Sequence, residues 1–417
     1  MGLALLISSV SGDALASGWE INLFGYGSDT SVEQSTQASC TEGADITLLG
    51  ARIISGNSAD ATFQFRDAGA NGQNVITITG TGTAEDTTHT DALGAGDLFN
   101  IAYTDTGTAS TISWLRANIE FAVGHGNFHG AATFTGQVFD VESSTRFLPL
   151  AGIILADGNA TEDNVEWLNR GYTSFEALQV RVSANARLNN SDFRNRINGG
   201  DGSLLCQFAT LVTGLVSDTS PADTLADGNT VNVAITLGAG VQDLTVVFVC
   251  ATSKSSSSKS ESFGGQQNGL ARTAGATAHY FPPGGYIASL TAFTEAQARA
   301  KIGFAAVVSN LRCYLSANTY TGNGTLKLYQ NGVAVITTTI TASGGAAWYE
   351  NATDMITIDA DDELSFEFDE GTSGSITIHS AGITFAPVAA GGQMFMMFPP
   401  RLDGIGRGGI FSGSRVQ

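Results

Sequence analysis

The sequence is poor in charged residues, and poorest in basic ones. Only 14% of its 417 residues are charged, and 39 acidic residues against 19 basic residues give a formal net charge of −20. The field of such a chain repels a phosphate backbone, which argues against nucleic acid as a partner. A chain of this length can form two to four ordinary domains, each with its own core.

Cysteine is scarce too, and no pair of cysteines is spaced to bind zinc. The four cysteines lie at positions 40, 206, 250 and 313, without a C-x-x-C pair. Cys250 and Cys313 share the inward phase of the apolar residues that alternate around them, which favours buried free thiols over disulfides. Cys206 and Cys250 are the pair that would form a bridge if the chain contains one.

Long apolar runs and the local motifs of common enzymes are absent as well. Residues 3–10 are apolar, but they are too few to span a bilayer and no basic residue precedes them, so we expect neither a membrane span nor a secretory signal. There is no G-x-S-x-G motif, no phosphate-binding P-loop and no dinucleotide fingerprint. Paired carboxylates that cleave glycosides need no local motif and stay open. We expect no catalytic residue and no cofactor.

Glycine, phenylalanine and small residues are what the sequence has in abundance. The chain contains 51 Gly and 23 Phe. Thr, Val, Ile and Phe fit pleated, half-buried surfaces, while Gly with Asn or Asp supplies the turns between strands. The composition therefore predicts an all-β protein.

An internal repeat organises the chain. Residues 178–185 and 311–318 share the pattern L-x-x-x-[VL]-S-A-N. Other landmarks lie at equal distances from the Asn of that pattern: Thr161 and Thr294 before it, then Gly199 and Gly332, and then Asp218 and Asn351 after it. A third and more divergent copy opens the chain, with Ser55 and Asn57 matching S-x-N. In it Glu85-Asp86-Thr87 corresponds to Ser217-Asp218-Thr219 and to Glu350-Asn351-Ala352.

Each copy alternates polar and apolar residues in short strands separated by turn residues, which is typical of an antiparallel sandwich. Asn331-Gly332 is a strong signal for a type I′ hairpin. We predict three tandem antiparallel β-sandwich domains, jelly-roll-like, with Ser55, Ser183 and Ser316 at equivalent positions. One short helix is expected at 294–301, and its counterparts in the other copies favour an edge strand. The predicted bounds are an N-terminal segment at 1–30, sandwiches at 31–121, 161–250 and 294–386, linkers at 122–160 and 251–293, and an extended C-terminal arm at 387–417.

These landmarks together resemble a tandem repeat that is common in phage and environmental viral structural proteins. The resemblance covers nearly the whole chain and includes no catalytic motif. It implies a non-enzymatic, self-assembling structural protein of a virion, such as a fibre, tail or capsid-surface component, located on the virion or an extracellular surface. Expected partners are copies of the chain itself, other virion proteins and a surface glycan. A subunit of a cellular extracellular tube or filament and a glycan-binding adhesin are the alternatives.

Three local features could bind a ligand. A turn that is dense in carboxylates could hold calcium, although a solvated polar turn is the simpler interpretation; its residues are Asp359, Asp361, Asp362 and Glu363. His125 and His129 have H-x-x-x-H spacing, but the three glycines around them exclude a helix and favour a flexible turn. Aromatic residues could stack on sugars, although core packing is their commoner role; they are Trp19, Trp114, Trp167, Trp348 and Tyr349.

The C-terminal arm carries the main prediction about assembly. A short motif of aromatic residues followed by proline precedes the second and third predicted sandwiches. It recurs at 396–401, where no sandwich follows. The arm is too rich in Gly to fold alone, and each large apolar side chain that it buries would contribute roughly 1.5–3 kcal/mol. We expect it to dock on a neighbouring copy, with folding back on its own third sandwich as the alternative. Its expected contact residues are Phe395, Phe398, Pro399, Pro400, Arg401, Ile410 and Phe411.

Overall fold

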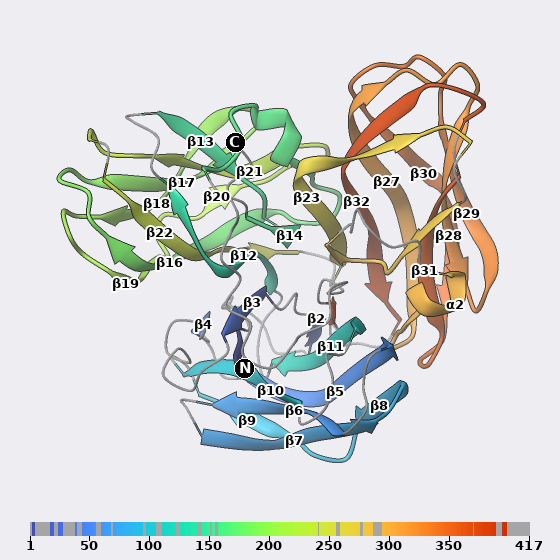
Figure 1. Ribbon diagram of the computed structural model, residues 1–417, viewed down its shortest axis with the longest axis horizontal. Coiled ribbons are helices and arrows are strands. Elements are labelled where there is room, and N and C mark those ends of the chain that lie inside the picture. Colours follow the sequence, from blue (N-terminus) through green and yellow to red (C-terminus); the bar gives the residue numbers. More distant parts are fainter. Residues whose placement is uncertain are drawn as a thin grey trace.

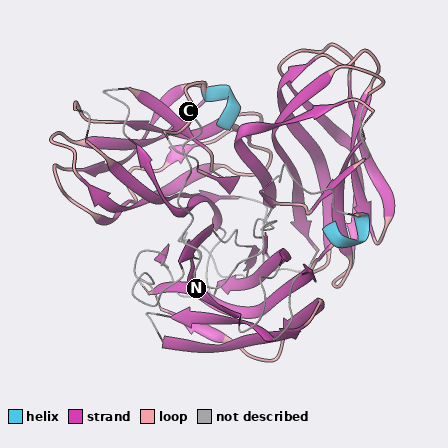
Figure 2. Cartoon of the chain, viewed as in Figure 1, coloured by secondary structure: helices cyan, strands magenta, loops and turns pink. Residues whose placement is uncertain are grey.

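The computed structural model confirms an all-β protein, in which the helices of the described residues are two single turns (Figure 2). Three sandwiches surround a common centre (Figure 1). We call them sandwiches 1, 2 and 3 in chain order. The structure describes residues 2–4, 17–20, 24–27, 38–39, 44–55, 60–67, 70–94, 97–105, 111–121, 126–139, 144–150, 152–154, 157–240, 242–255, 259–275, 278–286, 294–369, 371–388 and 394–397.

Sandwich 2 consists of two sheets whose strand orders are β12–β22–β16–β19 and β13–β21–β17–β18. The chain crosses between the sheets so that its first strand pairs with its last, which is the arrangement of an eight-stranded jelly roll. The strands are β12 (Gly126–Phe139), β13 (Thr145–Leu148), β16 (Ser174–Asn185), β17 (Ser191–Ile197), β18 (Gly200–Phe208), β19 (Gly214–Asp218), β21 (Thr230–Thr236) and β22 (Leu244–Lys254). Short additions are β14 (Gly152–Ile153), the 3-10 turn η2 (Glu162–Val165), β15 (Trp167–Leu168) and β20 (Asp223–Thr224).

Sandwich 3 repeats this topology, with strand orders β23–β32–β27–β30 and β24–β31–β28–β29. Its strands are β23 (Ser260–Thr273), β24 (His279–Phe281), β27 (Ala306–Asn318), β28 (Gly324–Gln330), β29 (Val333–Ile340), β30 (Ala347–Ile358), β31 (Glu363–Asp369) and β32 (Ser375–Pro387). Short additions are β25 (Gly285–Tyr286), α2 (Glu295–Ala298) and β26 (Ala300–Lys301). The equal strand orders agree with the prediction that 161–250 and 294–386 are copies of one fold.

Sandwich 1 has similar strand orders, β2–β11–β5–β8 and β1–β10–β6–β7, but its second strand and not its first pairs with the last strand. Its strands are β1 (Gly2–Ala4), β2 (Ser17–Glu20), β5 (Ala44–Ser55), β6 (Asp60–Asp67), β7 (Ala70–Thr79), β8 (Gly82–Asp86), β10 (Leu98–Asp105) and β11 (Thr111–Phe121). Short additions are β3 (Phe24–Gly27), which pairs with β1, β4 (Ala38–Ser39), which pairs with β10, and β9 (Asp91–Leu93), which pairs with β5.

The two segments predicted as linkers contain long strands, which corrects the sequence analysis. β12 and β23 lie inside 122–160 and 251–293, and each is the first strand of the sandwich that follows. Together with β14 they join sandwiches 2 and 3 in one continuous eleven-stranded sheet. Small residues serve close packing here, because a Cβ on Gly269 of β23 would lie 2.5 Å from Cγ2 of Thr377 in β32. Their Ser and Gly content indicated flexibility but reflects tight contact.

The landmark Asn of the repeat connects the two sheets in sandwiches 2 and 3. Asn185 ends β16, and its amide donates hydrogen bonds to the carbonyl oxygens of Ala209 and Val212 in the β18–β19 loop, at 3.0 and 2.9 Å. Asn318 ends β27 and donates in the same way to Thr341 O at 2.8 Å. Ser183 and Ser316 precede these residues by two positions in matching strands, whereas Ser55 is the last residue of β5.

A second landmark connects neighbouring strands of opposite sheets. Asp86, at the end of β8, accepts a hydrogen bond from the backbone N–H of Val75 in β7 at 3.1 Å. Asp218, at the end of β19, accepts one from Leu205 in β18 at 2.7 Å. Asn351 reverses the polarity and donates to Thr337 O in β29 at 2.8 Å. All three copies therefore have Asp or Asn at this position, and its side chain binds the backbone of the opposite sheet.

The turns follow their sequence signals with one exception. Asn198-Gly199 and Asn331-Gly332 each have positive φ at both positions, as a type I′ hairpin requires. The short helix α2 begins at a capping box formed by Thr294 and Gln297. Its counterpart in sandwich 2 begins with the 3-10 turn Glu162–Val165 and ends in the short strand β15, which pairs with β21, so the edge strand favoured there is confirmed for Trp167–Leu168 alone. Burial against neighbouring strands accommodates a helical turn at both places.

The described cysteines are free and buried, as the alternation predicted. Cys206, Cys250 and Cys313 have no exposed surface and form no disulfide. Burial raises the pKa of Cys206 to about 12, so the thiol stays protonated. Cys206 and Cys313 lie in the two separate hydrophobic cores that fill sandwiches 2 and 3. Cys40 lies outside the described residues.

Candidate functional site

The three sandwiches are linked by one repeated connection. After the last strand of one sandwich, the chain continues into a strand that pairs antiparallel with the last strand of the next sandwich in the ring. Thus β12 follows β11 and pairs with β22, and β23 follows β22 and pairs with β32. The final strand β33 (Met394–Met397) follows β32 and pairs with β11 of sandwich 1. The C-terminal strand therefore returns the chain to its first sandwich and closes a ring.

Sandwich 2 meets sandwich 3 at a contact that we call the 2/3 joint, built around Arg170, Glu261, Arg312 and Glu350. Arg170 precedes β16 and forms a two-pronged ion pair with Glu350 of β30, with Nε to Oε1 at 2.7 Å. Nη1 of Arg170 also reaches Asp227 of its own sandwich at 3.1 Å. Hydrogen bonding to Glu350 raises the pKa of Arg170, so this guanidinium stays charged.

The centre of the 2/3 joint is a fully buried ion pair. Nη2 of Arg312 in β27 lies 3.1 Å from Oε1 of Glu261 in β23, and neither side chain has exposed surface. The backbone N–H of Arg170 donates to the same carboxylate oxygen at 2.6 Å, and Arg312 Nε donates to Leu168 O at 3.2 Å. The Arg312 guanidinium also lies 4.4 Å from the centre of the Phe263 ring. Groups from both sandwiches therefore hold one buried pair.

Burial shifts the pKa values of both residues of this pair. It raises the pKa of Glu261 to about 7, against the opposing effects of Arg312 and of the hydrogen bond from Arg170. Burial also lowers the pKa of Arg312, although a guanidinium remains charged over the whole ordinary pH range. The joint therefore carries a carboxylate that titrates near neutrality beside a fixed positive charge.

Sandwich 3 meets sandwich 1 through a more exposed set of charges, which we call the 3/1 joint. Lys301 of β26 lies 3.1 Å from a carboxylate oxygen of Glu85 in β8 and 2.9 Å from one of Asp361. Arg299 reaches Glu363 at 3.4 Å. The charges of Glu363 and Arg299 both act on Arg52 of β5, so this network spans the two sandwiches.

The glutamates of the two joints occupy equivalent positions of the repeat, whereas their cations do not. Glu350 and Glu85 each directly precede the landmark Asn351 or Asp86. Each accepts a cation from the neighbouring sandwich, which is Arg170 in one joint and Lys301 in the other. A contact that joins different surfaces in head-to-tail order closes a ring when the rotation allows it. Both joints therefore pair a glutamate at the same repeat position with a cation of the neighbouring sandwich.

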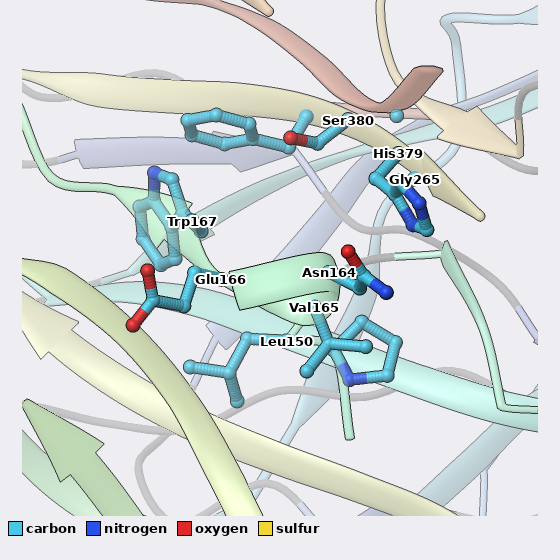
Figure 3. Close-up of a pocket in the computed structure, with 11 residues that line it drawn as sticks. Leu150, Asn164, Val165, Glu166, Trp167, Gly265, His379 and Ser380 are labelled. Carbon is cyan, nitrogen blue, oxygen red and sulfur yellow. The ribbon is translucent and has the colours of Figure 1, made fainter. Parts of the chain in front are cut away.

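A small cavity lies beside the 2/3 joint, between η2, β23 and β32 (Figure 3). Its volume is about 20 Å³, which is room for about one water molecule and not for a substrate. Figure 3 shows Trp167, Glu166 and Asn164 on one side, with His379 and Ser380 opposite. Its lining is Pro149, Leu150, Asn164, Val165, Glu166, Trp167, Phe263, Gly264, Gly265, His379 and Ser380.

The acidic turn, considered for calcium, is occupied by protein partners. Asp361 pairs with Lys301, and Glu363 lies near Arg299. Asp362 accepts hydrogen bonds from Gln330 at 2.6 Å and from the backbone N–H of Asp359 at 2.8 Å. Across the described ranges, no three His, Cys, Asp or Glu residues are grouped to hold a metal ion.

The other candidate ligand-binding residues divide between core, strand and undescribed segments. Trp167 is buried, 5.4 Å from the Tyr172 ring and 4.9 Å from the Phe263 ring, which is core packing. Tyr349 is buried as well. His129 lies in β12, so the turn expected there is wrong, while His125 lies outside the described residues. Trp19 and Trp114 lie in β2 and β11, and Trp348 contacts the Tyr314 ring at 5.4 Å.

Of the seven expected contact residues of the arm, the structure describes Phe395, which lies in β33 and pairs with Asn118 of β11. Phe398, Pro399, Pro400, Arg401, Ile410 and Phe411 lie outside the described residues. The pairing partner is neither a neighbouring copy nor the third sandwich, which were the two partners considered from the sequence. Docking of the remaining arm residues on another copy stays a prediction.

Sequence reasoning missed the residues that form the joints. Arg312 stands inside the repeat pattern, but alternation assigned it to the solvent side, and Glu261 lies in the segment predicted as a linker. A second missed landmark is Asp91, which binds the backbone N–H groups of Gln73 and Asn74. Asp223 binds Ser203 in the same way at 2.8 Å. Its signal was present, since both aspartates follow the earlier landmark Asp by five positions.

Comparisons with known proteins give a fold likeness and no family. No protein-family profile matches the sequence, and no curated protein matches it. Among solved structures, the chain is similar to one from Sulfolobus turreted icosahedral virus, with 13% identity, 82% of this chain and 79% of the other covered, and a TM-score of 0.19. An archaeal virus protein described by a triple jelly roll fold and turret assembly has 12% identity, 84% and 81% coverage, and a TM-score of 0.20. The major capsid protein P2 of bacteriophage PM2 has 10% identity, 64% and 99% coverage, and a TM-score of 0.19. TM-scores this low carry no functional argument.

Proposed function

We propose that this chain is a non-enzymatic structural protein that assembles with copies of itself on or in a virion. The observation that carries the proposal is the ring of three jelly rolls held by buried and half-buried ion pairs. One chain then presents three similar jelly rolls around a common centre, as a subunit of a closed shell or a tube could. Fold alone does not establish function, so the argument rests on these joints.

Three further observations support a structural role. The cavity at the 2/3 joint is too small for a substrate. Jelly rolls recur in viral capsid proteins, although lectins and cupins use them as well. The excess of acidic residues keeps separate copies soluble until a specific contact forms. No helix among the described residues is long and apolar enough to cross a membrane.

Within this proposal, the C-terminal arm links copies. Strand β33 anchors the arm on sandwich 1 of its own chain. Residues 398–417 continue from that anchor and carry Arg401, Arg407 and Arg415 against a chain of net charge −20. Such a segment suits an acidic surface of a neighbouring copy, and the contact would be heterologous.

Assembly of the purified full chain tests the proposal. We expect sedimentation velocity and negative-stain electron microscopy to show closed or tubular particles that form with increasing concentration. Removal of residues 398–417 should leave a folded monomer, because β33 stays in place. A chain that remains monomeric at every concentration and ionic strength would contradict the proposal, as would reproducible hydrolysis of glycans, peptides or esters lost on changing one carboxylate. A glycan array that gives specific binding without assembly would favour the adhesin.

A further inference from the structure

One end of sandwich 2 exposes a cluster of large apolar side chains. Leu188, Leu211 and Val212 are 58%, 62% and 44% exposed, and they are three of the eight exposed large hydrophobic side chains among the described residues. They lie together, because Thr210 Oγ1 donates to Leu188 O at 3.0 Å and Asn185 binds the carbonyl oxygen of Val212. We call these three residues the apolar tip.

The same turn in sandwich 3 shows that the scaffold does not require apolar residues there. The N–H of Val212 donates to Ala209 O at 3.1 Å, and the N–H of Gly344 donates to Thr341 O at 3.3 Å. Within each turn one residue has left-handed backbone, namely Leu211 with φ of 60° and Ser343 with φ of 52°. Ser343 and Gly344 therefore occupy the positions of Leu211 and Val212. Thr321 stands where Leu188 stands, three residues after the landmark Asn.

Sandwich 2 therefore has a strained, exposed leucine at this turn, where sandwich 3 has a serine. A bulky residue in the left-handed region is strained, because its Cβ comes too close to the following carbonyl oxygen. Leu211 is strained and also exposed, and nothing in the turn geometry favours it over the Ser of sandwich 3. Strained and exposed apolar residues gather at binding surfaces, since binding recovers the burial that folding does not.

The charge around the apolar tip indicates what could cover it. The described loops at this end, residues 186–191, 209–213 and 238–243 without 241, contain one cation, Arg187. Arg187 has no exposed surface and donates to Phe139 O at 2.6 Å and Gly240 O at 2.6 Å. Asp192 and Asp243 flank the tip. An apolar segment with basic residues would therefore match this end of sandwich 2.

Residues 398–417 of the chain have that composition. They contain Leu402, Ile405, Ile410 and Phe411 between glycines, with three arginines and one aspartate. The segment carries a net charge of +2, whereas the rest of the chain carries −22. It begins where the described chain ends on sandwich 1, and its twenty residues could extend on the order of 65 Å.

We propose that the apolar tip of sandwich 2 receives residues 398–417 of a neighbouring copy. This inference rests on the proposed self-assembly and names its receiving surface. Phe411 and the isoleucines bury Leu188, Leu211 and Val212, while the arginines approach Asp192 and Asp243. Each copy then donates an arm and offers a tip, so the contact propagates from copy to copy.

Disulfide trapping between two populations tests the contact directly. One population of the full chain carries L211C and the other carries F411C, both with Cys40 replaced by Ser, and the three other cysteines are buried. Neither population can form this bond within one chain. We expect mild oxidation of the mixture to give at least tenfold more mixed disulfide than a mixture of V333C and F411C. Val333 is the matched control, because it is 64% exposed on sandwich 3.

A second variant tests the apolar character of the tip. L211S/V212G copies the turn of sandwich 3, so it should fold, and circular dichroism with thermal unfolding checks that it does. We expect its self-association constant, measured by sedimentation, to fall at least tenfold, whereas V333S should leave it unchanged. Equal trapping with V333C, or unchanged association of L211S/V212G, overturns the assignment of the tip while particle formation still supports the proposed function. A monomeric unmodified chain would instead contradict the proposed function itself.

Discussion

The 2/3 joint and the 3/1 joint each have a glutamate at the same position of the repeat but differ in burial. Arg312 and Glu261 have no exposed surface, and Arg170 and Glu350 are 21% and 13% exposed. At the 3/1 joint, Lys301 and Glu85 are 30% and 16% exposed, and Asp361 is 76% exposed. The 2/3 joint also continues one sheet from sandwich to sandwich.

The difference in burial means that the ion pairs of the two joints have different effects on the structure. A buried pair contributes little net stability over apolar residues, but it strongly penalises any arrangement that leaves one charge alone. Both charges of this pair belong to sandwich 3, and sandwich 2 supplies the N–H of Arg170 and the carbonyl oxygen of Leu168 that bind them. A shift of sandwich 2 would leave these buried charges short of hydrogen bonds, so they favour one position of sandwich 3 on sandwich 2. An exposed pair contributes little and is screened by salt, so the 3/1 joint can adjust at small cost. Sandwich 1 and the strand β33 are thus the adjustable side of the ring.

The largest effect should follow from breaking the buried pair on one side. E261A leaves Arg312 buried without its carboxylate, and we expect a loss of about 3–5 kcal/mol in the free energy of unfolding at pH 8. Urea denaturation measures the loss, and hydrogen exchange of peptides from 160–175 and 260–273 should localise it to the 2/3 joint. Unchanged exchange in those peptides would argue against the joint as the seat of the effect.

A double variant separates the charge from the packing. R312M/E261L removes both charges and fills the space with apolar side chains, which is commonly neutral or stabilising. We expect it to recover most of the stability that E261A loses. If the double variant were as unstable as E261A, loss of packing would explain both results and the buried charge would not.

Acid should act on the two sides of the ring in opposite directions. Burial would raise the pKa of Asp86 in sandwich 1, but hydrogen bonds from His89, Val75 and Thr88 outweigh it and hold the pKa at about 2. Since this pKa lies below the usual value, the stability it contributes is present above about pH 4 and is lost as the pH falls through 2. The expected contribution is about 2 kcal/mol, and D86N should remove this acid dependence.

At Glu261 of the 2/3 joint, the pH dependence of stability has the opposite sign. Its pKa is raised to about 7, so the folded chain holds the proton more tightly than the unfolded chain does. The 2/3 joint should therefore gain stability as the pH falls from about 7 to about 4.5, and E261Q should flatten this gain. Hydrogen exchange at pH 8 and pH 5 checks the sign at Glu261, and urea denaturation at pH 5 and pH 2.5 checks the sign at Asp86. Parallel changes on the two sides would refute the contrast.

The sequence predicted the repeat unit well because its landmarks make local, directional hydrogen bonds. Asn185 and Asn318 stand at the same corner of each jelly roll, and Asn331-Gly332 forms the expected hairpin. Period-2 alternation also indicated short strands within 294–386, where the structure has β27 to β32. These features depend on residues within one domain, where spacing along the chain limits which groups can meet.

The joints could not be predicted in this way because they depend on which domain surfaces meet. Alternation assigned Arg312 to solvent, and it would be exposed if sandwich 3 stood alone. Serine and glycine in 251–293 indicated a flexible linker, whereas they let β23 pack against its neighbours. The acidic turn at Asp361 was considered as a calcium site, although one of its carboxylates pairs with Lys301. The partner groups come from distant parts of the chain.

The smallest expected effect concerns the exposed pair at the 3/1 joint. K301A removes the cation that Glu85 and Asp361 share. We expect a loss of about 0.2–1 kcal/mol in the free energy of unfolding at low salt, and less at 1 M NaCl, because exposed pairs are weak and screened. K301R serves as the matched control, since it keeps the charge and should keep most of the stability. If K301A cost as much as E261A, burial would not distinguish the joints, and the 3/1 joint would orient sandwich 1 as strictly as the 2/3 joint orients sandwich 3.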